Sequence, residues 1–201
     1  EDRGECFYIA DPAGKDDNIA AFNDAVSTLD TSFAGGYYPW VKIMDSDRNK
    51  PMWVPPSVIM PAVFAYNDKV GFEWFAPAGF KRGSLDNVIE TKEFLNKIDL
   101  DSLYSNKVNP IATFNGEVVV WGQKTLQTKS SALDRINVRR LIIKAKKFIA
   151  SVTKYLVFDN NTIALRNSFV NQCTPFFDNI QQKNGLYAFK VIMDETTNTT
   201  D

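Results

Sequence analysis

Residues 131–158 read SALDRINVRRLIIKAKKFIASVTKYLVF and have the pattern of a long amphipathic helix. From Val138 onward, apolar side chains recur at the three- and four-residue spacing that places them on one helical face. Between Arg135 and Lys154 the other faces carry Lys and Arg residues and no Asp or Glu. We therefore predict a helix with an apolar side that packs into a core and an exposed side that is basic.

A strand–helix–strand unit is predicted near the start of the chain. Residues 6–10 form a short apolar run that ends in turn residues, and Asp16 or Asp17 can then cap a helix to about Leu29. Residues 37–44 are again rich in strand-forming side chains. Such a unit favours a partly parallel sheet with helices on its faces. A nucleotide site is not favoured, because the turn has one glycine and two following carboxylates that would repel a phosphate.

The later elements are predicted from turn signals and strand-forming runs. Residues 45–49 alternate acids as a calcium loop does, but they lack its central glycine and closing glutamate and therefore predict a hairpin turn. Asn115-Gly116 is a strong hairpin signal, and we expect the two strands that flank it at the centre of the sheet. Further strands are expected at 52–54, 85–89, 109–114, 117–121 and 186–193, further helices at 55–65, 100–105 and 162–182, and a polar tail at 194–201.

These elements predict an α/β (α+β) fold. We expect a mixed β-sheet flanked by helices, in one compact domain over residues 1–201, with two long C-terminal helices and a final strand. A chain of 201 residues with 44% hydrophobic side chains can bury one substantial core. The first strand begins almost at the first residue and no initiator methionine precedes it, so we expect a fragment of a longer protein. No apolar run approaches membrane-spanning length, and we expect no membrane partner.

The sequence contains no histidine, which removes the commonest general base and the commonest metal ligand. Four carboxylates stand at the ends of predicted elements, but no motif brings two of them together, and caps or surface charges are the favoured interpretation. They are Asp45, Asp134, Asp194 and Glu195. We expect no catalytic residue, metal or cofactor. An α/β enzyme that uses carboxylates stays an alternative without support.

The sequence also predicts where its cysteines and large aromatic side chains lie. Cys6 and Cys173 fall in apolar patterns without metal or disulfide spacing, so both are expected to be inert. Residues 72–83 hold several aromatics in a loop with Gly and Pro, which either folds back onto the core or meets a neighbour. Four large aromatic side chains are expected in the core rather than at an interface: Trp40, Trp53, Trp121 and Phe158.

The basic side of the helix at 135–154 has three interpretations. It is a solvated face, a surface that contacts phosphates, or a surface that contacts an acidic protein. A nucleic-acid-binding module that uses this helix is therefore the alternative function. The net charge of −1 and the absence of an aromatic stacking platform beside the helix argue against direct contact with nucleic acid.

Seven short blocks stand in series along nearly the whole chain. They are YPWVK (38–42), WVPPS (53–57), APAG (76–79), VNPI (108–111), VWGQKT (120–125), NVRRL (137–141) and DETTN (194–198). Together and in this order they resemble the tail sheath proteins of contractile bacteriophages. One block alone would be weak evidence, whereas seven in series are specific.

The resemblance implies a structural subunit and not an enzyme. Sheath subunits polymerise helically around a rigid tail tube and contract to drive it through the host envelope during DNA ejection. The implied partners are other sheath subunits, the tail tube protein, and the baseplate and tail terminator proteins. The implied location is the virion tail, after assembly in the cytoplasm of the host bacterium.

The family also implies how subunits join. Extended N-terminal and C-terminal arms add strands to the sheets of neighbouring subunits. By this comparison the chain begins after the N-terminal arm and stops before the C-terminal arm, with residues 194–201 leading into it. Without these arms, we expect this fragment to be monomeric.

Charged residues on the basic helix are candidate contacts with the tube or with adjacent sheath subunits. Such contacts can break and re-form in a new register at little cost. The candidates are Arg139, Arg140, Lys144 and Lys147. Arg135 is expected to pair locally with Asp134.

Overall fold

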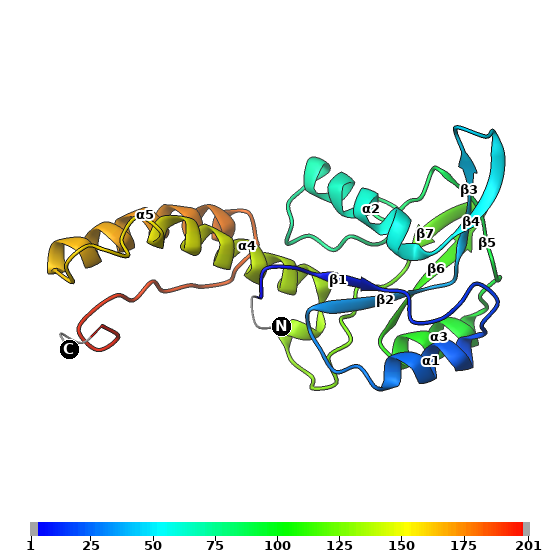
Figure 1. Ribbon diagram of the computed structural model, residues 1–201, viewed down its shortest axis with the longest axis horizontal. Coiled ribbons are helices and arrows are strands. Elements are labelled where there is room, and N and C mark those ends of the chain that lie inside the picture. The colour runs from blue at the N-terminus through cyan, green and yellow to red at the C-terminus, as the bar shows by residue number, and fades with distance from the viewer. Residues whose placement is uncertain (1–3, 199–201) are drawn as a thin grey trace. The chain divides into compact units, whose positions relative to one another are not determined.

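The computed structural model describes residues 4–198, and its contacts group the chain into two compact units, residues 1–140 and 141–201 (Figure 1). The boundary falls inside helix α4 (Ile136–Thr153). Whether both units unfold together as the one expected domain stays a prediction, because compactness alone does not define a cooperative unit. No helix among the described residues is long and apolar enough to cross a bilayer.

A four-stranded mixed sheet is central to the first unit (Figure 1). Its strands, in spatial order, are β1 (Tyr8–Ala10), β2 (Ala34–Tyr38), β6 (Val108–Phe114) and β7 (Glu117–Val120). β1, β2 and β6 run parallel, and β7 is antiparallel to β6. The predicted α/β class is therefore confirmed.

The predicted strand–helix–strand unit is confirmed as β1, α1 (Ile19–Ser27) and β2. The cap of α1 differs from the expectation. The Asn18 side chain, not Asp16 or Asp17, accepts a hydrogen bond from the Ala21 N–H at 3.0 Å. Asp17 instead accepts from the Gly14 N–H within the preceding turn.

A second sheet corrects the prediction of a single one. Its antiparallel strands, in spatial order, are β4 (Lys50–Val54), β3 (Val41–Asp45) and β5 (Val88–Thr91). The single strand expected at 37–44 is two strands, because Pro39 has no N–H to continue the ladder of β2. The turn expected at 45–49 is confirmed, since it joins β3 to β4 and the Asp45 carboxylate accepts from the Asp47 N–H.

Helices cover both faces of the four-stranded sheet, because successive side chains of a strand point to opposite sides. Tyr37 packs in one core cluster, with Met60 and Val63 of α2 (Pro56–Val70). Tyr38 packs in the other, with Phe22 of α1 and Leu103 of α3 (Lys97–Ser105). Figure 1 shows α1 and α3 beside one another.

The hairpin predicted at Asn115-Gly116 is confirmed, and both residues have positive φ. Its placement at the centre of the sheet is right for β6 only. β7 is the last strand of the order, and residues 79–85 cover its outer edge. The Gly79 N–H donates to the Val120 carbonyl at 2.9 Å, and the Leu85 N–H donates to the Val118 carbonyl at 2.9 Å.

The second unit contains the rest of α4 and the helix α5 (Ile163–Gln182). Thr162 caps α5 by accepting from the Leu165 N–H, as the predicted start at 162 requires. Phe148 of α4 stacks on Phe176 of α5 with ring centroids 3.9 Å apart.

The final strand expected at 186–193 is wrong. This segment has no strand partner in the described chain, although Phe189 packs against Phe177 with ring centroids 5.6 Å apart. A strand is defined by its pairing, and strand-forming composition alone does not supply a partner. Residues 194–198 form a turn, and the rest of the predicted polar tail lies outside the described residues.

Candidate interaction surfaces

The start of α4 is anchored by backbone contacts with residues 123–125. A 3₁₀ turn (Ala132–Asp134), capped by Ser131, precedes the helix. The Ile136 N–H donates to the Gln123 carbonyl, and the Thr125 hydroxyl donates to the Leu133 carbonyl. The predicted local pair is confirmed, since Arg135 Nε lies 3.2 Å from Asp134 Oδ1.

Two of the four candidate contact residues make intrachain contacts in the first unit. Arg139 is only 5% exposed, lies over the Phe33 ring at 4.0 Å, and donates to the Ser32 hydroxyl. Arg140 donates twice to the Asp68 carboxylate, at 2.6 and 2.7 Å. The predicted exposed basic side is therefore wrong at Arg139. Helical periodicity places a residue on a face, but loop residues 32–33, distant in sequence, decide whether that face is covered.

The other two candidates lie on α4 in the second unit. Lys147 is exposed, and Lys144 is half-buried. They are three positions apart, so their side chains lie on the same side of the helix. Lys147 therefore has the exposure that the candidate contact role needs.

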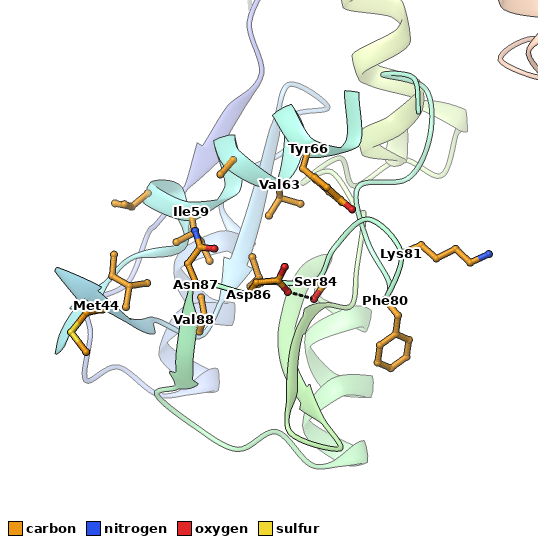
Figure 2. Close-up of a pocket in the computed structure, with 14 residues that line it drawn as sticks. Met44, Ile59, Val63, Tyr66, Phe80, Lys81, Ser84, Asp86, Asn87 and Val88 are labelled. Atoms are coloured by element: carbon orange, nitrogen blue, oxygen red, sulfur yellow. Dashed lines mark hydrogen bonds between the residues drawn. The ribbon is translucent and has the colours of Figure 1, made fainter. Parts of the chain in front are cut away.

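A groove in the first unit has a volume of about 410 Å³ (Figure 2). α2 supplies one wall with Ile59, Val63 and Tyr66, and residues 84–88 supply the opposite wall. Figure 2 shows the Asp86 carboxylate at the groove, where it accepts a hydrogen bond from the Ser84 hydroxyl at 3.0 Å. The lining is mainly apolar, which suits docking of apolar side chains better than acid–base chemistry.

Three aromatic side chains form a partly exposed cluster that adjoins this groove through Phe80. Phe80, Phe114 and Trp121 contact one another, with centroid separations of 4.7–5.8 Å. Trp121 is 44% exposed and Phe80 is 49% exposed. The predicted core position of Trp121 is therefore wrong, because Trp121 follows the last residue of the edge strand β7. In the loop at 72–83, Trp74 is buried, which agrees with the interpretation that this loop folds back onto the core. Contact of its exposed Phe80 with a neighbour stays a prediction.

The connection between α4 and α5 exposes apolar residues in the second unit. Phe158 is 99% exposed and Tyr155 is 81% exposed, so the predicted core position of Phe158 is wrong. Trp40 and Trp53 are half-buried. Sequence reasoning missed these surfaces because an apolar side chain reads as core until the fold shows what covers it.

The titratable side chains of the described residues do not gather into a metal site. No group of three or more His, Cys, Asp or Glu residues there could hold a metal ion. Burial raises the pKa of the Cys173 thiol and keeps it protonated, as expected for an inert cysteine. Cys6 is exposed, although the run 6–10 that begins with it is apolar in sequence. Burial also raises the pKa of Tyr37 above its ordinary value, which leaves its hydroxyl neutral.

Comparison with known families accounts for almost the whole chain. Residues 1–126 match the central domain of phage tail sheath proteins, and residues 128–201 match the C-terminal domain of phage tail sheaths. The chain belongs to the phage tail sheath family. The resemblance seen in the seven sequence blocks is thereby confirmed.

Sheath proteins of phages are among its relatives. The tail sheath protein of Vibrio phage KVP40 is 39% identical over 175 residues, which cover 86% of this chain and 26% of that protein. The tail sheath protein of Enterobacteria phage T4 is 33% identical over 163 residues, which cover 81% of this chain and 24% of that protein. The chain thus spans about a quarter of the length of these relatives.

Solved sheath structures have the same fold. The sheath of an extracellular contractile injection system, the PVC complex in its contracted state, is 25% identical with a TM-score of 0.78, over 92% of this chain and 51% of that one. The contracted helical sheath of the anti-feeding prophage has a TM-score of 0.74 at 24% identity. The match covers 92% of this chain and 48% of that one.

Proposed function

We propose that this chain is part of a structural subunit of a contractile phage tail sheath, which polymerises helically around the tail tube and contracts to drive it through the host envelope. The observation that carries the proposal is the succession of two sheath-domain matches over residues 1–126 and 128–201. Such a role requires no catalysis, since contraction draws on the difference in contact free energy between two packings of the same subunits.

Exposed apolar surfaces support repeated contacts between subunits. The groove beside α2 and the cluster of Phe80, Phe114 and Trp121 share Phe80 and make one surface of the first unit, whereas Phe158 is exposed in the second unit. A contact between two different patches of identical subunits generates a ring if its rotation closes and a helical filament if it does not. Large exposed aromatic side chains are also the residues that dominate interface energies.

The unpaired segment 186–193 supports strand exchange between subunits. Its composition favours a strand, yet the described part of the chain contains no partner for it. Addition to the sheet of a neighbouring subunit would supply the missing backbone hydrogen bonds. The expectation that this chain on its own is a monomer is tested by light scattering, and oligomers of this chain would show that the segment 186–193 is enough to join subunits.

Further partners in this proposal are the tail tube, baseplate and tail terminator proteins, in a virion tail assembled in the host cytoplasm. Lys144 and Lys147 are the proposed charged contacts with the tube or with an adjacent subunit. Arg139 and Arg140 are not kept in this role, because Phe33, Ser32 and Asp68 occupy their guanidinium groups. The nucleic-acid alternative relied on the basic side of the helix at 135–154, from which Arg139 is withdrawn by burial, and it is not supported.

Electron microscopy tests the proposal. The full reading frame that contains this chain, expressed alone and with its tube protein, should form tubes of regular diameter. A protein that stays soluble and never forms tubes under either condition contradicts the proposal.

The charged contacts are tested in the same assay. A Lys144→Glu, Lys147→Glu double variant should form at least tenfold fewer tubes, whereas the exposed Lys129→Glu control should assemble normally. Normal assembly of the double variant would remove both lysines from the proposed interface.

A further inference from the structure

Arg166 is a buried charge in the first turn of α5. The residue is 6% exposed, although it stands only four positions after the cap of the helix. Its one ion pair in the described residues joins Nη2 to Oε1 of Glu195 across 3.9 Å, which is too long for a hydrogen bond. The buried Nε–H has no hydrogen-bond partner there. Arg166 is thus removed from water without the hydrogen bonds that normally accompany burial.

Burial of this kind is unfavourable for a single subunit. A guanidinium carries five N–H donors, and a buried charge is retained when a partner and hydrogen bonds offset its lost hydration. Glu195 offsets little of that loss, because its own side chain is 77% exposed and therefore stays hydrated. The arginine is positioned for a closer carboxylate than the one it has.

The guanidinium lines a shallow cleft in the second unit. The cleft has a volume of about 360 Å³, and Ile163 and Met193 contribute apolar surface beside Arg166. The first-turn N–H groups of α5 add a favourable field for an anion. This cleft has room for a carboxylate side chain and an apolar neighbour.

The other acid at the cleft is already engaged. The Asp194 carboxylate accepts from the Thr196 N–H at 2.9 Å and from the Thr196 hydroxyl at 2.5 Å. These bonds hold the pKa of Asp194 below its ordinary range and keep the carboxylate in its own turn. Glu195 is therefore the acid that an incoming carboxylate would displace, and its exposed side chain can move into solvent.

We propose that Arg166 binds a carboxylate side chain from a second copy of this chain, and that Glu195 occupies the site loosely until that copy arrives. The inference rests on the proposed function, because in a helical sheath most neighbours of a subunit are identical copies. A planar guanidinium can hold a carboxylate in two parallel hydrogen bonds, which fixes the direction of approach. The contact would thus help to fix the position of one subunit relative to the next in the assembly.

The first test measures the stability of this chain on its own. If Arg166 is poorly paired in the single subunit, the Arg166→Met variant should unfold at the same temperature as the unsubstituted chain or up to about 5 °C higher. Lys154→Met, an exposed change in the same unit, controls for the loss of one positive charge. A melting temperature lowered by more than about 5 °C would show that Arg166 serves the fold of its own subunit and would overturn the proposal.

The second test measures assembly of the full reading frame by electron microscopy. Arg166→Gln should reduce the yield of tubes at least tenfold and Arg166→Lys should reduce it less, because lysine keeps the charge but loses the planar pair of donors. Lys154→Gln should assemble normally. Normal tubes from Arg166→Gln overturn this inference and leave the proposed function intact. If the unsubstituted protein forms no tubes, the proposed function fails, and so does the second copy as the source of the carboxylate.

Discussion

The Asn109 side chain joins three backbone segments inside the first unit. It is completely buried, its Nδ2 donates to the carbonyls of Gly36 (3.0 Å) and Lys124 (2.8 Å), and its Oδ1 accepts from the Lys124 N–H at 2.5 Å. Gly122 passes so close that an added Cβ would lie 2.9 Å from Asn109 Oδ1. A neutral amide is the side chain that can donate and accept at once in this position.

Asn109→Ala should lower the free energy of unfolding by about 2–4 kcal/mol, because it leaves buried donors and acceptors of Gly36 and Lys124 unpaired. Urea unfolding of this chain measures the change. Asn106→Ala is the matched control: it removes an exposed hydrogen bond to the Ser102 carbonyl and should cost less than about 1 kcal/mol. Equal costs for the two variants would contradict the assigned role of Asn109.

Asp11 gives the protein a predictable pH dependence. Burial raises its pKa above the ordinary 3.8, and the hydrogen bonds from Ser57 only partly oppose this shift. The folded chain therefore binds the proton more tightly than the unfolded chain, and stability falls as pH rises from the ordinary pKa through the raised one. Asp11→Asn should remove this fall and be more stable than the unsubstituted chain at pH 7.

Melting temperatures between pH 3 and pH 7 test the Asp11 prediction. Ser57→Ala serves as the opposing variant, since loss of its hydroxyl should raise the pKa of Asp11 further and steepen the fall. A pH profile that Asp11→Asn leaves unchanged would show that other groups control the acid range.

At the level of the elements, the segment 79–85 contributes to two features of the first unit. It pairs with the outer edge of β7, and it supplies part of the groove lining. The segment turns tightly at Gly83, where an added Cβ would lie 2.8 Å from the Cα of Ala78. Backbone atoms cannot move aside as a flexible side chain can.

Gly83→Ala should therefore cost about 1–3 kcal/mol of unfolding free energy, through displacement of the segment from β7. Gly14→Ala is the control, because its Cβ would approach no atom closer than 3.4 Å. Urea unfolding measures both variants, and a Gly83→Ala variant as stable as Gly14→Ala contradicts the prediction.

Local signals predicted elements well where neighbours in sequence are also partners in space. The Asn115-Gly116 hairpin and the α1 crossover are examples. The segment 186–193 shows the opposite case. Its composition predicted a strand, but pairing depends on a partner that the local sequence does not contain.

For the molecule as a whole, the sequence boundary between the two compact units falls inside one helix. α4 runs from Ile136 to Thr153 across the boundary at 140–141. Helix formation is cooperative along a continuous hydrogen-bonded segment, so melting of one half of α4 weakens the other. We expect the chain to unfold in one transition despite its two units.

Tryptophan fluorescence and far-ultraviolet circular dichroism test this expectation. All four tryptophans lie in residues 1–140, whereas the dichroism signal also reports α5. The two urea curves should coincide within error. A second step seen by dichroism alone would show that the two units are separate domains.

The sequence by itself determined the family, the α/β class, the crossover and hairpin, and the two long helices, because each depends on motifs or on contacts between near neighbours. Tertiary structure determined which side chains are covered. The NVRRL block carries one arginine buried against Phe33 and one paired with Asp68, and the tryptophan of the VWGQKT block lies exposed at a sheet edge. Burial is a property of surfaces brought together from distant parts of the chain, and periodicity along one helix or strand does not contain it.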